Sequence, residues 1–560
     1  MLYNIEYLET RNGGKTIRVN QYLLHSKYNP NKEAERIIKK EYKENYVHIL
    51  FGYGRGYLAD AFYQHQKNSE VLLIIDPIKE ELHIENKEVF NFEMLDQFKI
   101  KLENSLEYFD TEVHVICSPN YEKLFPEEYK GILQLVKEVQ ITNKVISNTI
   151  ERYSEQWQEN LIHNMVYLIE DQLLDVYYKQ VQKPIVIASG GPSLSKQLSI
   201  IKEHRATIFL MAAGSTINSL LHEGIIPDMV VSVDGGDMNY QHFKDITINI
   251  PLVYSLNNHY KIQKEWNGLR YVFIDLKDTD MQAKINKKYN INLPLIQGGG
   301  SVANYCYSIA TALTDKPIAL IGQDLAYTNL QSHAVGNRSG GEISQEFLLN
   351  RKAFEILDCN GKKTYTDYPF MSMKKDFEEL VVEYPPATFV YNCTEAGIPI
   401  EGITNLDFIE FIKKFSSKNV NVDNTKMYSK SHIEWSLLKE NFITEISLCT
   451  KLAKECSDMI LIMKQDYYRK QFSSTTLKAL KNIDLKLKET IENEIMLGSS
   501  LEPLIRAVLL GYKGHSGETE EEKFDRVYKQ NIHWYQGIAD AMKNMQNYIE
   551  NAIKLGDELY

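Results

Sequence analysis

Glycine-rich turns follow apolar runs in the middle of the sequence, and they carry residue types suited to binding an anion. The run Ile185–Ala188 is typical of a buried strand, and Ser189-Gly-Gly-Pro-Ser-Leu194 follows it directly. Pro192 is favoured in the first turn of a helix, so the chain is predicted to pass here from strand to helix. Glycines let the backbone approach a ligand, and N–H groups at a helix start attract an anion. A tight turn without a ligand has the same pattern, and both interpretations stay open.

Two further turns have the same character. Met211-Ala-Ala-Gly-Ser-Thr216 again leads from a strand into a helix. Ile296-Gln-Gly-Gly-Gly-Ser301 opens a helix predicted at 302–313. Three glycines followed by a serine form an anion cradle, which suits the phosphate of a nucleotide.

Acidic residues and one histidine supply the groups for chemistry. Val231-Ser-Val-Asp-Gly-Gly-Asp237 places Asp234 and Asp237 after a predicted strand, where open α/β sheets bind their ligands. These acids could hold a sugar or ribose hydroxyl or a metal, and the alternative for Asp237 is a helix N-cap. His333 follows Gly322-Gln-Asp-Leu-Ala-Tyr-Thr328 in a polar loop. A positioned histidine is typically worth about 10²–10⁴-fold in rate through proton transfer, although a lone loop histidine is more often incidental.

These turns need a sheet to position them. Short apolar runs bounded by glycine or proline and separated by helical lengths predict parallel sheets with crossover helices. In the first 150 residues such runs lie at 46–51, 71–75 and 113–116. In the middle they lie at 185–188, 207–211, 229–233, 251–254, 271–274 and 318–321. Residues 151–179 are predicted to form one continuous helix between the two series.

The last part of the chain has a different pattern. From Trp435 to Met463, apolar residues recur at spacings of three or four, which predicts one face of a long helix. Further helices are predicted after Ser474 and from about residue 519, with a loop at 511–517. The predicted fold class is α/β, with two Rossmann-like α/β domains, N-terminal and central, followed by an all-α C-terminal domain. The predicted boundaries are 1–150, 151–415 and 416–560.

Other motifs have simpler explanations. Gly52-x-Gly-x-Gly56 with Asp76 matches a nucleotide or methyl-donor fingerprint by letter, but a structural or vestigial role is favoured. Cys449 and Cys456 lie on the apolar helix face and are predicted core residues. His515, beside the acidic run 518–522, is predicted to lie in a solvated turn before a helix start. Nothing around Asp278-Thr-Asp280 places that pair for a metal.

Composition narrows the class of protein. Of 560 residues, 63 are basic and 75 are acidic, which gives a net charge of −12. This balance argues against nucleic-acid binding through bulk charge. No apolar run is long enough to span a bilayer, and the first residues lack the pattern of a secretory signal. The six cysteines are scattered without metal-ligand spacing, so we expect a reducing, cytoplasmic location.

With these motifs in place, the chain resembles the motility accessory factor (Maf) family of bacterial flagellin glycosyltransferases. The resemblance spans nearly the whole chain, and the order and spacing of the set are more specific than any single motif. The central part is in turn similar to bacterial sialyltransferases that use a CMP-activated nine-carbon acidic sugar. The matching segments are Ser189–Leu194, Pro227–Asp234, Gly298–Ala303 and Gly322–Thr328 with His333.

The resemblance implies transfer of a nonulosonic acid, of pseudaminic or legionaminic type, from a CMP donor to serine or threonine of flagellin. It implies catalytic roles for His333, Asp234 and Asp324. Asparagine is expected at the position of Asp234 in the sialyltransferases, which is a departure of this chain. No cofactor or metal is required by this chemistry. The implied donor- and nucleotide-binding residues are Ser189, Gly190, Gly191, Pro192, Ser193, Gly214, Ser215, Thr216, Gly235, Gly299, Gly300, Ser301, Gln323 and Tyr327.

Two rival functions fit parts of the sequence. A related core resembles archaeal pterin pyrophosphokinases, which transfer diphosphate from ATP and need no helical domain for a protein acceptor. The other rival is a non-catalytic flagellin-binding or export-chaperone protein with a relic nucleotide fold. Polar, glycine-rich turns argue against a relic, because a relic has no need to keep them polar. The identity of the sugar and the oligomeric state stay open.

Overall fold

In the computed structural model, the chain forms two compact units. One holds 1–151, 458–478 and 502–537, and the other holds 152–457, 479–501 and 538–560. His515 lies outside the described residues, as does most of the predicted loop 511–517. The predicted three-domain boundaries stay a prediction. The structure describes residues 4–67, 70–78, 88–106, 112–386, 388–416, 433–497, 501, 504, 505, 508, 512, 514 and 518–560.

The first unit contains a four-stranded parallel sheet, in the order β6-β5-β4-β7. Its strands confirm the three predicted runs and add a short edge strand. A three-stranded antiparallel sheet of β1, β2 and β3 precedes it and was not predicted. The strands are β1 (Ile5–Glu9), β2 (Lys15–Val19), β3 (Tyr22–Leu23), β4 (Val47–Phe51), β5 (Leu72–Ile75), β6 (Val89–Phe90) and β7 (Val113–Cys117). The helices around them include α1 (Pro30–Glu41), α2 (Tyr57–His65), α3 (Leu95–Leu106) and α4 (Tyr121–Leu124).

The glycine turn after β4 is filled by the protein's own side chains. The carboxylate of Asp76 accepts hydrogen bonds from the backbone N–H of Tyr53 at 2.7 Å and from the Tyr121 hydroxyl at 2.9 Å. A Cβ atom on Gly52 would lie 2.5 Å from the Tyr121 ring, so that ring occupies the space that glycine opens. The side chains of Tyr121 and Asp76 therefore pack closely against this turn.

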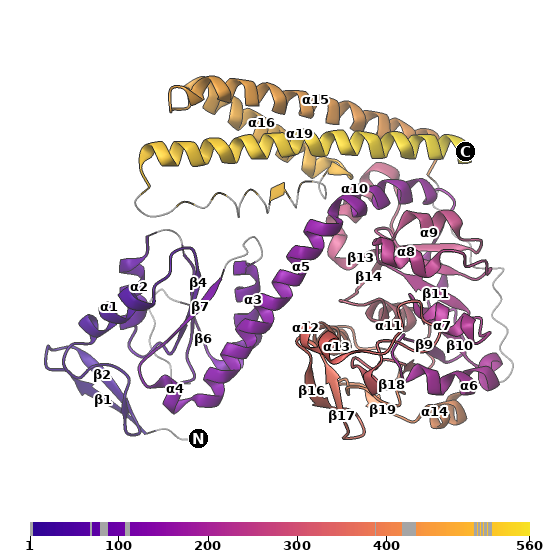
Figure 1. Ribbon diagram of the computed structural model, residues 1–560, viewed down its shortest axis with the longest axis horizontal. Coiled ribbons are helices and arrows are strands. Elements are labelled where there is room, and N and C mark those ends of the chain that lie inside the picture. The colour runs from indigo at the N-terminus through magenta and orange to yellow at the C-terminus, as the bar shows by residue number, and fades with distance from the viewer. Residues whose placement is uncertain are drawn as a thin grey trace. The chain divides into compact units, whose positions relative to one another are not determined.

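The second unit is built on a large sheet whose main path runs β14-β13-β12-β11-β10-β9-β15-β18-β19, with β8 pairing β13. Figure 1 labels β9, β10, β11, β13 and β14 among these strands. Its strands pair in parallel. All four residues of β9 are buried, as a central strand covered on both faces requires. The strands are β8 (Gln172–Leu173), β9 (Ile185–Ala188), β10 (Phe209–Ala213), β11 (Met229–Ser232), β12 (Leu252–Ser255), β13 (Arg270–Asp275), β14 (Leu295–Ile296), β15 (Ile318–Ile321), β18 (Val390–Asn392) and β19 (Thr404–Asn405).

The chain changes direction across the sheet between β9 and β15. From β9 the strands proceed to β14 on one side, and β15 then pairs with the free side of β9. Such a switch point opens a crevice at the carboxyl ends of the strands, where ligands of open α/β sheets bind. The helix α11 (Val302–Leu313) begins and ends where predicted and packs on β9, β10 and β11. Its apolar face joins the main core through Ala303, Cys306, Tyr307, Ile309, Ala310 and Leu313.

Shorter elements surround this sheet. A hairpin of β16 (Phe354–Leu357) and β17 (Lys363–Thr366) was not predicted. α14 packs against α6 and β15. The helices are α6 (Leu194–His204), α7 (Thr216–His222), α8 (Asp237–Phe243), α9 (Tyr260–Glu265), α10 (Thr279–Tyr289), α12 (Gln345–Asn350), α13 (Tyr368–Glu383) and α14 (Phe408–Phe415).

The helix predicted at 151–179 is wrong in both boundaries. α5 runs from Pro126 to Tyr167, and β8 follows it within a few residues. The chain leaves the helix where Asp171 becomes buried, because its carboxylate accepts from the Arg270 guanidinium at 2.6 Å and from the Tyr254 hydroxyl. This tertiary ion pair overrides the local helical pattern.

In the described residues of the C-terminal region, three long helices are present, as predicted. In the second unit, Lys439 at the start of α15 binds Asp557 near the end of α19 at 2.6 Å. Cys449 and Cys456 are buried core residues of α15, as expected. Among the helices of the described ranges, none combines the length and hydropathy that a bilayer crossing requires. The helices are α15 (Trp435–Tyr467), α16 (Ser474–Asn493) and α19 (Glu520–Leu559). The α/β fold class with a helical C-terminal region is confirmed.

Candidate functional site

The turns after β9 and β15 are joined at the switch point. Asp324 accepts hydrogen bonds from the Ser193 backbone N–H at 3.1 Å and from its hydroxyl at 2.5 Å. The N–H of Gly191 donates to the carbonyl of Gly322 at 2.8 Å, and a Cβ atom on Gly191 would lie 2.4 Å from Asp324. The glycine is therefore needed for contact between the two turns. The Gly191 N–H and the polar groups of Ser193 were predicted to face a nucleotide. In the structure they donate hydrogen bonds to Gly322 and Asp324.

The carboxyl group of Asp324 is almost completely enclosed, with 2% of the residue exposed. Burial raises its pKa to about 6, although hydrogen bonds from Ser193 act in the opposite direction. The predicted catalytic role of Asp324 requires contact with reacting atoms. Its burial and its bonds to Ser193 instead favour positioning of the turn after β9.

A loop at residues 331–342, here termed the crossing loop, is anchored to several of these turns. The N–H of Ala334 donates to the Gly190 carbonyl at 3.0 Å, and the Val335 N–H donates to Ser195 Oγ at 3.0 Å. The amide of Asn337 donates to the Ser215 carbonyl and hydroxyl, both at 3.3 Å. A backbone bridge between Gln331 and Glu342 closes the loop at its base. The crossing loop thereby brings His333 to the turn after β9.

His242 on α8 is a second histidine of this site, and the sequence analysis missed it. Its Nε2 lies 3.2 Å from the Ser339 hydroxyl of the crossing loop, and the Arg338 guanidinium donates to the Gln241 carbonyl. Burial lowers the pKa of His242, the charges of His333 and Arg338 lower it further, and Asp234 raises it. Burial also lowers the pKa of His333, opposed in part by the Ser339 backbone. Both rings are therefore favoured as neutral proton acceptors at neutral pH.

Two buried hydroxyl groups of the predicted site have no hydrogen-bond partner within the described ranges. They are Ser189 Oγ and Thr216 Oγ1, in residues that are 5% and 1% exposed. A Cβ atom placed on Gly190 would lie 3.4 Å from Thr216 Oγ1 and 3.4 Å from the His333 ring. The Gln323 side-chain carbonyl is likewise buried and unpaired among the described residues. Buried polar groups are normally satisfied by protein or by water, so these groups mark a candidate place for a polar ligand.

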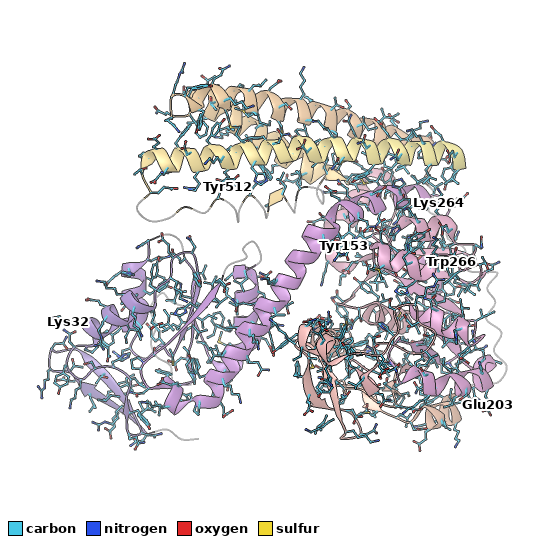
Figure 2. All side chains as sticks on the ribbon, in the orientation of Figure 1. Lys32, Tyr153, Glu203, Lys264, Trp266 and Tyr512 are labelled. Atoms are coloured by element: carbon cyan, nitrogen blue, oxygen red, sulfur yellow. The ribbon has the colours of Figure 1, made fainter. Side chains whose placement is uncertain are left out.

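The acidic turn after β11 has its own support from α5. Asp234 is exposed, and its Oδ1 accepts from the Gly236 N–H at 2.8 Å. Gly235 is predicted to bind the donor, yet it is buried: a Cβ atom there would lie 2.6 Å from Trp157. The Asn160 amide donates to the Gly235 carbonyl at 2.9 Å. Gly235 is therefore placed against α5. Tyr153, labelled on α5 in Figure 2, would lie 3.5 Å from a Cβ atom on Gly236 of the same turn.

The capping alternative for Asp237 is not what the structure shows. Gly236 occupies the N-cap position of α8, and Asp237 is the first helical residue. Its carboxylate instead accepts from the Gln156 amide at 2.9 Å and lies 3.1 Å from His259 Nε2. The hydrogen bond from His259 lowers the pKa of Asp237.

The turn before α11 already holds a carboxylate of the protein. The Gly300 N–H donates to Asp376 Oδ2 at 2.6 Å, and a Cβ atom on Gly299 would lie 2.7 Å from the Asp376 Cβ. Ser301 caps α11 through a reciprocal pair of hydrogen bonds with Asn304. Asp376 thus occupies part of the predicted phosphate cradle, at Gly299 and Gly300, while the Ser301 hydroxyl bonds Asn304. The start of α11 nevertheless lies beside the turn after β10, because Val302 packs against Gly214.

Several acidic side chains lie near the turn before α11. Tyr305 donates to Asp275. Burial raises the pKa of Tyr305, and the charges of Asp275, Asp278 and Asp376 raise it further. Burial, and then Asp275, raise the pKa of Asp278 to about 6. Within the described ranges, no three histidine, cysteine or acidic side chains are arranged to hold a metal ion.

Tyr327 is not brought to the candidate site. Its hydroxyl donates to Asp367 at 2.7 Å, and Asp367 also accepts from Arg351 at 2.8 Å. The ring packs in a small separate core with Ile343 and Leu348. The structure therefore groups the turns after β9, β10, β11 and β15 with His333, and it adds His242 and Asn337.

A solved structure is similar to nearly the whole chain. The structure of the Maf glycosyltransferase from Magnetospirillum magneticum AMB-1 aligns over 99% of this chain and 91% of that chain, with a TM-score of 0.55 and 14% sequence identity. This chain has the Maf glycosyltransferase fold. The resemblance found in the sequence is thereby confirmed at the level of fold.

The family model described as "6-hydroxymethylpterin diphosphokinase MptE-like" matches residues 159–330, which is under a third of the chain. No curated protein matches the sequence. Within the Maf fold, the family-model match covers the turns after β9, β10 and β11 and the start of α11, and it ends before His333.

Proposed function

We propose that the chain is a glycosyltransferase that moves a nonulosonic acid, of pseudaminic or legionaminic type, from a CMP-activated donor to serine or threonine of flagellin. The observation that carries this proposal is the grouping of unpaired hydroxyls with His333 and His242, whose pKa values are lowered by burial, at the β9/β15 switch point of a Maf-like fold.

The residues of the site suit each part of such a transfer. The bond between the sugar's anomeric carbon and the phosphate breaks, and CMP leaves with the bonding electrons. The anomeric carbon then bonds to the acceptor oxygen, whose proton passes to a base. A neutral histidine, His333 or His242, can take that proton. The exposed carboxylate of Asp234 lies close enough to His242 to affect its pKa, and it can stabilise positive charge on the sugar ring.

The direct test is the intact mass of flagellin co-expressed with this chain and a CMP-nonulosonate pathway. We expect the mass of one or more nonulosonic acid residues to be added. A variant with His333→Gln and His242→Gln serves as the inactive control. Unmodified flagellin in the presence of the wild-type chain and a working pathway would contradict the proposal.

The family model favours a second candidate, diphosphate transfer from ATP to a hydroxymethylpterin. Incubation of the purified chain with ATP and the pterin, in parallel with the CMP-sugar and flagellin, separates the two reactions. Turnover of the pterin alone would replace the glycosyltransferase proposal. Binding of flagellin without turnover of either donor would support a chaperone.

The C-terminal helices are the proposed flagellin-recognition region. Their main apolar faces are buried within the protein, but α15 and α16 also expose Leu437, Ile443 and Leu485, which a helical partner can cover. A chain ending near residue 415 that still glycosylates flagellin would contradict this assignment.

A further inference from the structure

The turn between β11 and α8 holds Asp234 at the edge of the second unit's sheet. Its carboxylate is exposed, and two glycines, Gly235 and Gly236, follow it in the chain. Glycine restricts the backbone less than other residues do, so this sequence alone leaves the direction of the Asp234 side chain poorly defined. A group that acts on a substrate must be held to within about 0.5 Å, which requires support from neighbouring side chains.

Asn239 on α8 holds the first peptide group of this turn. Its side-chain amide donates to the Asp234 carbonyl at 2.7 Å and to the Ser232 hydroxyl at 2.9 Å. It also donates to Asn258 Oδ1 at 3.1 Å, and that oxygen accepts from the Ser232 hydroxyl at 2.8 Å. Asn239 is 7% exposed, and Ser232 and Asn258 are completely buried. The Asp234 carbonyl is thereby tied to a buried cluster of polar side chains that begins on β11.

Asn160 on α5 holds the second peptide group of the turn. Its amide donates to the Gly235 carbonyl at 2.9 Å, and its Oδ1 accepts from the Tyr260 N–H at 3.2 Å. Asn160 is completely buried, and a Cβ atom on Gly235 would lie 2.7 Å from its Nδ2. Asn160 therefore links the turn after β11 to the start of α9, at a distance that leaves no room for a side chain on Gly235.

These two amides act on consecutive peptide planes. Asn239 bonds the carbonyl of the plane that follows Asp234, and Asn160 bonds the carbonyl of the next plane. Because each peptide group is planar, fixing both planes fixes the backbone dihedral angles of Gly235 between them. The Asp234 side chain is then left with its own torsions, and its Oδ1 accepts from the Gly236 N–H at 2.8 Å.

Asn164, one turn further along α5, provides a comparison within the same helix face. It is as completely buried as Asn160, and its amide donates to the carbonyls of Leu256 and Asn258 at 2.8 and 2.7 Å. These carbonyls belong to the turn after β12. Asn160 and Asn164 therefore hold neighbouring turns, and of the two it is Asn160 that bonds the turn carrying Asp234.

We propose that Asn239 and Asn160 are positioning residues for Asp234, which hold its turn from two sides and so keep its carboxylate in one direction toward the sugar. Their effect on glycosyl transfer rests on the proposed function. The placement of the Asp234 charge does not, because that charge also acts on His242 in the free protein.

A double-mutant cycle in the full chain tests this role. Asn160→Leu and Asn239→Leu each remove an amide at similar volume, and Asn164→Leu is the matched control. Asn160→Leu and Asn239→Leu should each lower kcat by about tenfold or more and leave KM for the CMP-sugar within about twofold of wild type. In an Asp234→Asn background the same changes should lower kcat by less than about twofold, because a positioning residue acts only through the group that it positions.

The control separates positioning from stability. Asn164→Leu leaves buried carbonyls without a donor, so it should lose as much thermal stability as Asn160→Leu and still keep kcat within about twofold of wild type. Asn160→Asp, which retains the acceptor for the Tyr260 N–H and lacks the donor to Gly235, takes the place of Asn160→Leu if the latter does not fold. Equal losses of kcat in both backgrounds, or an equal loss in Asn164→Leu, would overturn the inference.

His242 gives a readout that needs no turnover. Asp234 raises the pKa of His242, so Asp234→Asn should lower that pKa in NMR titrations of the histidine-labelled chain. Asn160→Leu and Asn239→Leu should lower it as well, and Asn164→Leu should leave it unchanged. If the wild-type chain transfers no sugar, the proposed function fails and this titration decides the placement of Asp234. An unchanged pKa of His242 in both positioning variants would then overturn the inference.

Discussion

The carboxylate of Asp324 holds Ser193 by two hydrogen bonds, one from its backbone N–H and one from its hydroxyl. These residues follow β15 and β9, the two strands that flank the switch point of the sheet. The pair therefore fixes the distance between two turns that come from segments 131 residues apart in the chain. Asp324 therefore positions the turns at the sheet edge. The hydroxyls without a partner in the described residues, those of Ser189 and Thr216, are uncharged groups that a ligand can contact.

Removal of this link should destabilise the second unit. Asp324→Ala leaves two buried donors of Ser193 without an acceptor, at a cost of about 1–3 kcal/mol for each unsatisfied group. Asp324→Asn keeps one acceptor oxygen and should cost less. Chemical unfolding followed by circular dichroism measures the difference. Equal stability of the wild type and Asp324→Ala would contradict the positioning role.

Protonation of His333 and His242 should determine how the rate of glycosyl transfer falls at low pH, which is the acidic limb of the pH–rate profile. Burial lowers the pKa of both His333 and His242, so both rings stay neutral somewhat below the ordinary histidine pKa of about 6.5. We expect kcat/KM for glycosyl transfer to fall only below that pH. His333→Gln should lower kcat by about 10²–10⁴-fold, as expected for loss of a general base.

The two histidines can be distinguished by comparison of single variants. If His333 is the base, His242→Gln should retain most of the activity and leave the acidic limb in place, because burial and the Ser339 backbone, and not the charge of His242, shift the pKa of His333. Larger loss in His242→Gln than in His333→Gln would assign the base to His242. An acidic limb that is unchanged in both variants would contradict either assignment.

Asp234 should act through its charge. Its Oδ1 accepts the Gly236 N–H, and an asparagine can make the same bond, so Asp234→Asn should preserve the turn. Loss of the negative charge should still lower the glycosylation rate, by roughly 10²-fold if the carboxylate stabilises the sugar cation. Flagellin binding, measured by pull-down, should be unchanged. Normal glycosylation by Asp234→Asn would remove Asp234 from the proposed mechanism.

Much of the sheet could be predicted because its signals are local. The strand β9 is four buried residues followed by glycines, and α11 begins at a serine cap that follows three glycines. Strand ends predicted in this way also locate the turns at the sheet edge. The hairpin of β16 and β17 was missed because neither of its strands is continuously buried. Its sequence therefore lacks the apolar run that marked the other strands.

The direction of individual side chains could not be predicted in the same way. Tyr327 follows β15 in a matching motif, yet it bonds Asp367 in a separate small core. Asp376 comes from α13 and enters the turn before α11, with no signal near Gly300 in the sequence. His242 and Asn337 became part of the site only through the path of the crossing loop. These contacts depend on tertiary packing, which local patterns do not encode.

A buried ionic cluster joins the C-terminal helices to the second unit's sheet domain, and it should make stability depend on pH. Glu445 on α15 is 1% exposed by side chain and lies 3.5 Å from Lys288 on α10, which also binds Glu494. Burial, as the largest cause, raises the pKa of Glu445 from 4.5 to about 7, with Lys288 acting to lower it and Glu494 to raise it. The folded protein therefore binds a proton here that the unfolded chain releases above about pH 4.5.

The stabilising contribution of this proton is complete below about pH 4.5 and is lost as the pH rises through about 7. Between pH 5 and 7.5, the free energy of unfolding of the wild type should fall relative to Glu445→Gln, by an amount on the order of 2 kcal/mol. Lys288→Met should make the dependence steeper, because Lys288 stabilises the charged form of Glu445. Urea unfolding of the three proteins across this range measures the effect. Parallel pH curves for wild type and Glu445→Gln would show that Glu445 titrates alike in the folded and unfolded chain.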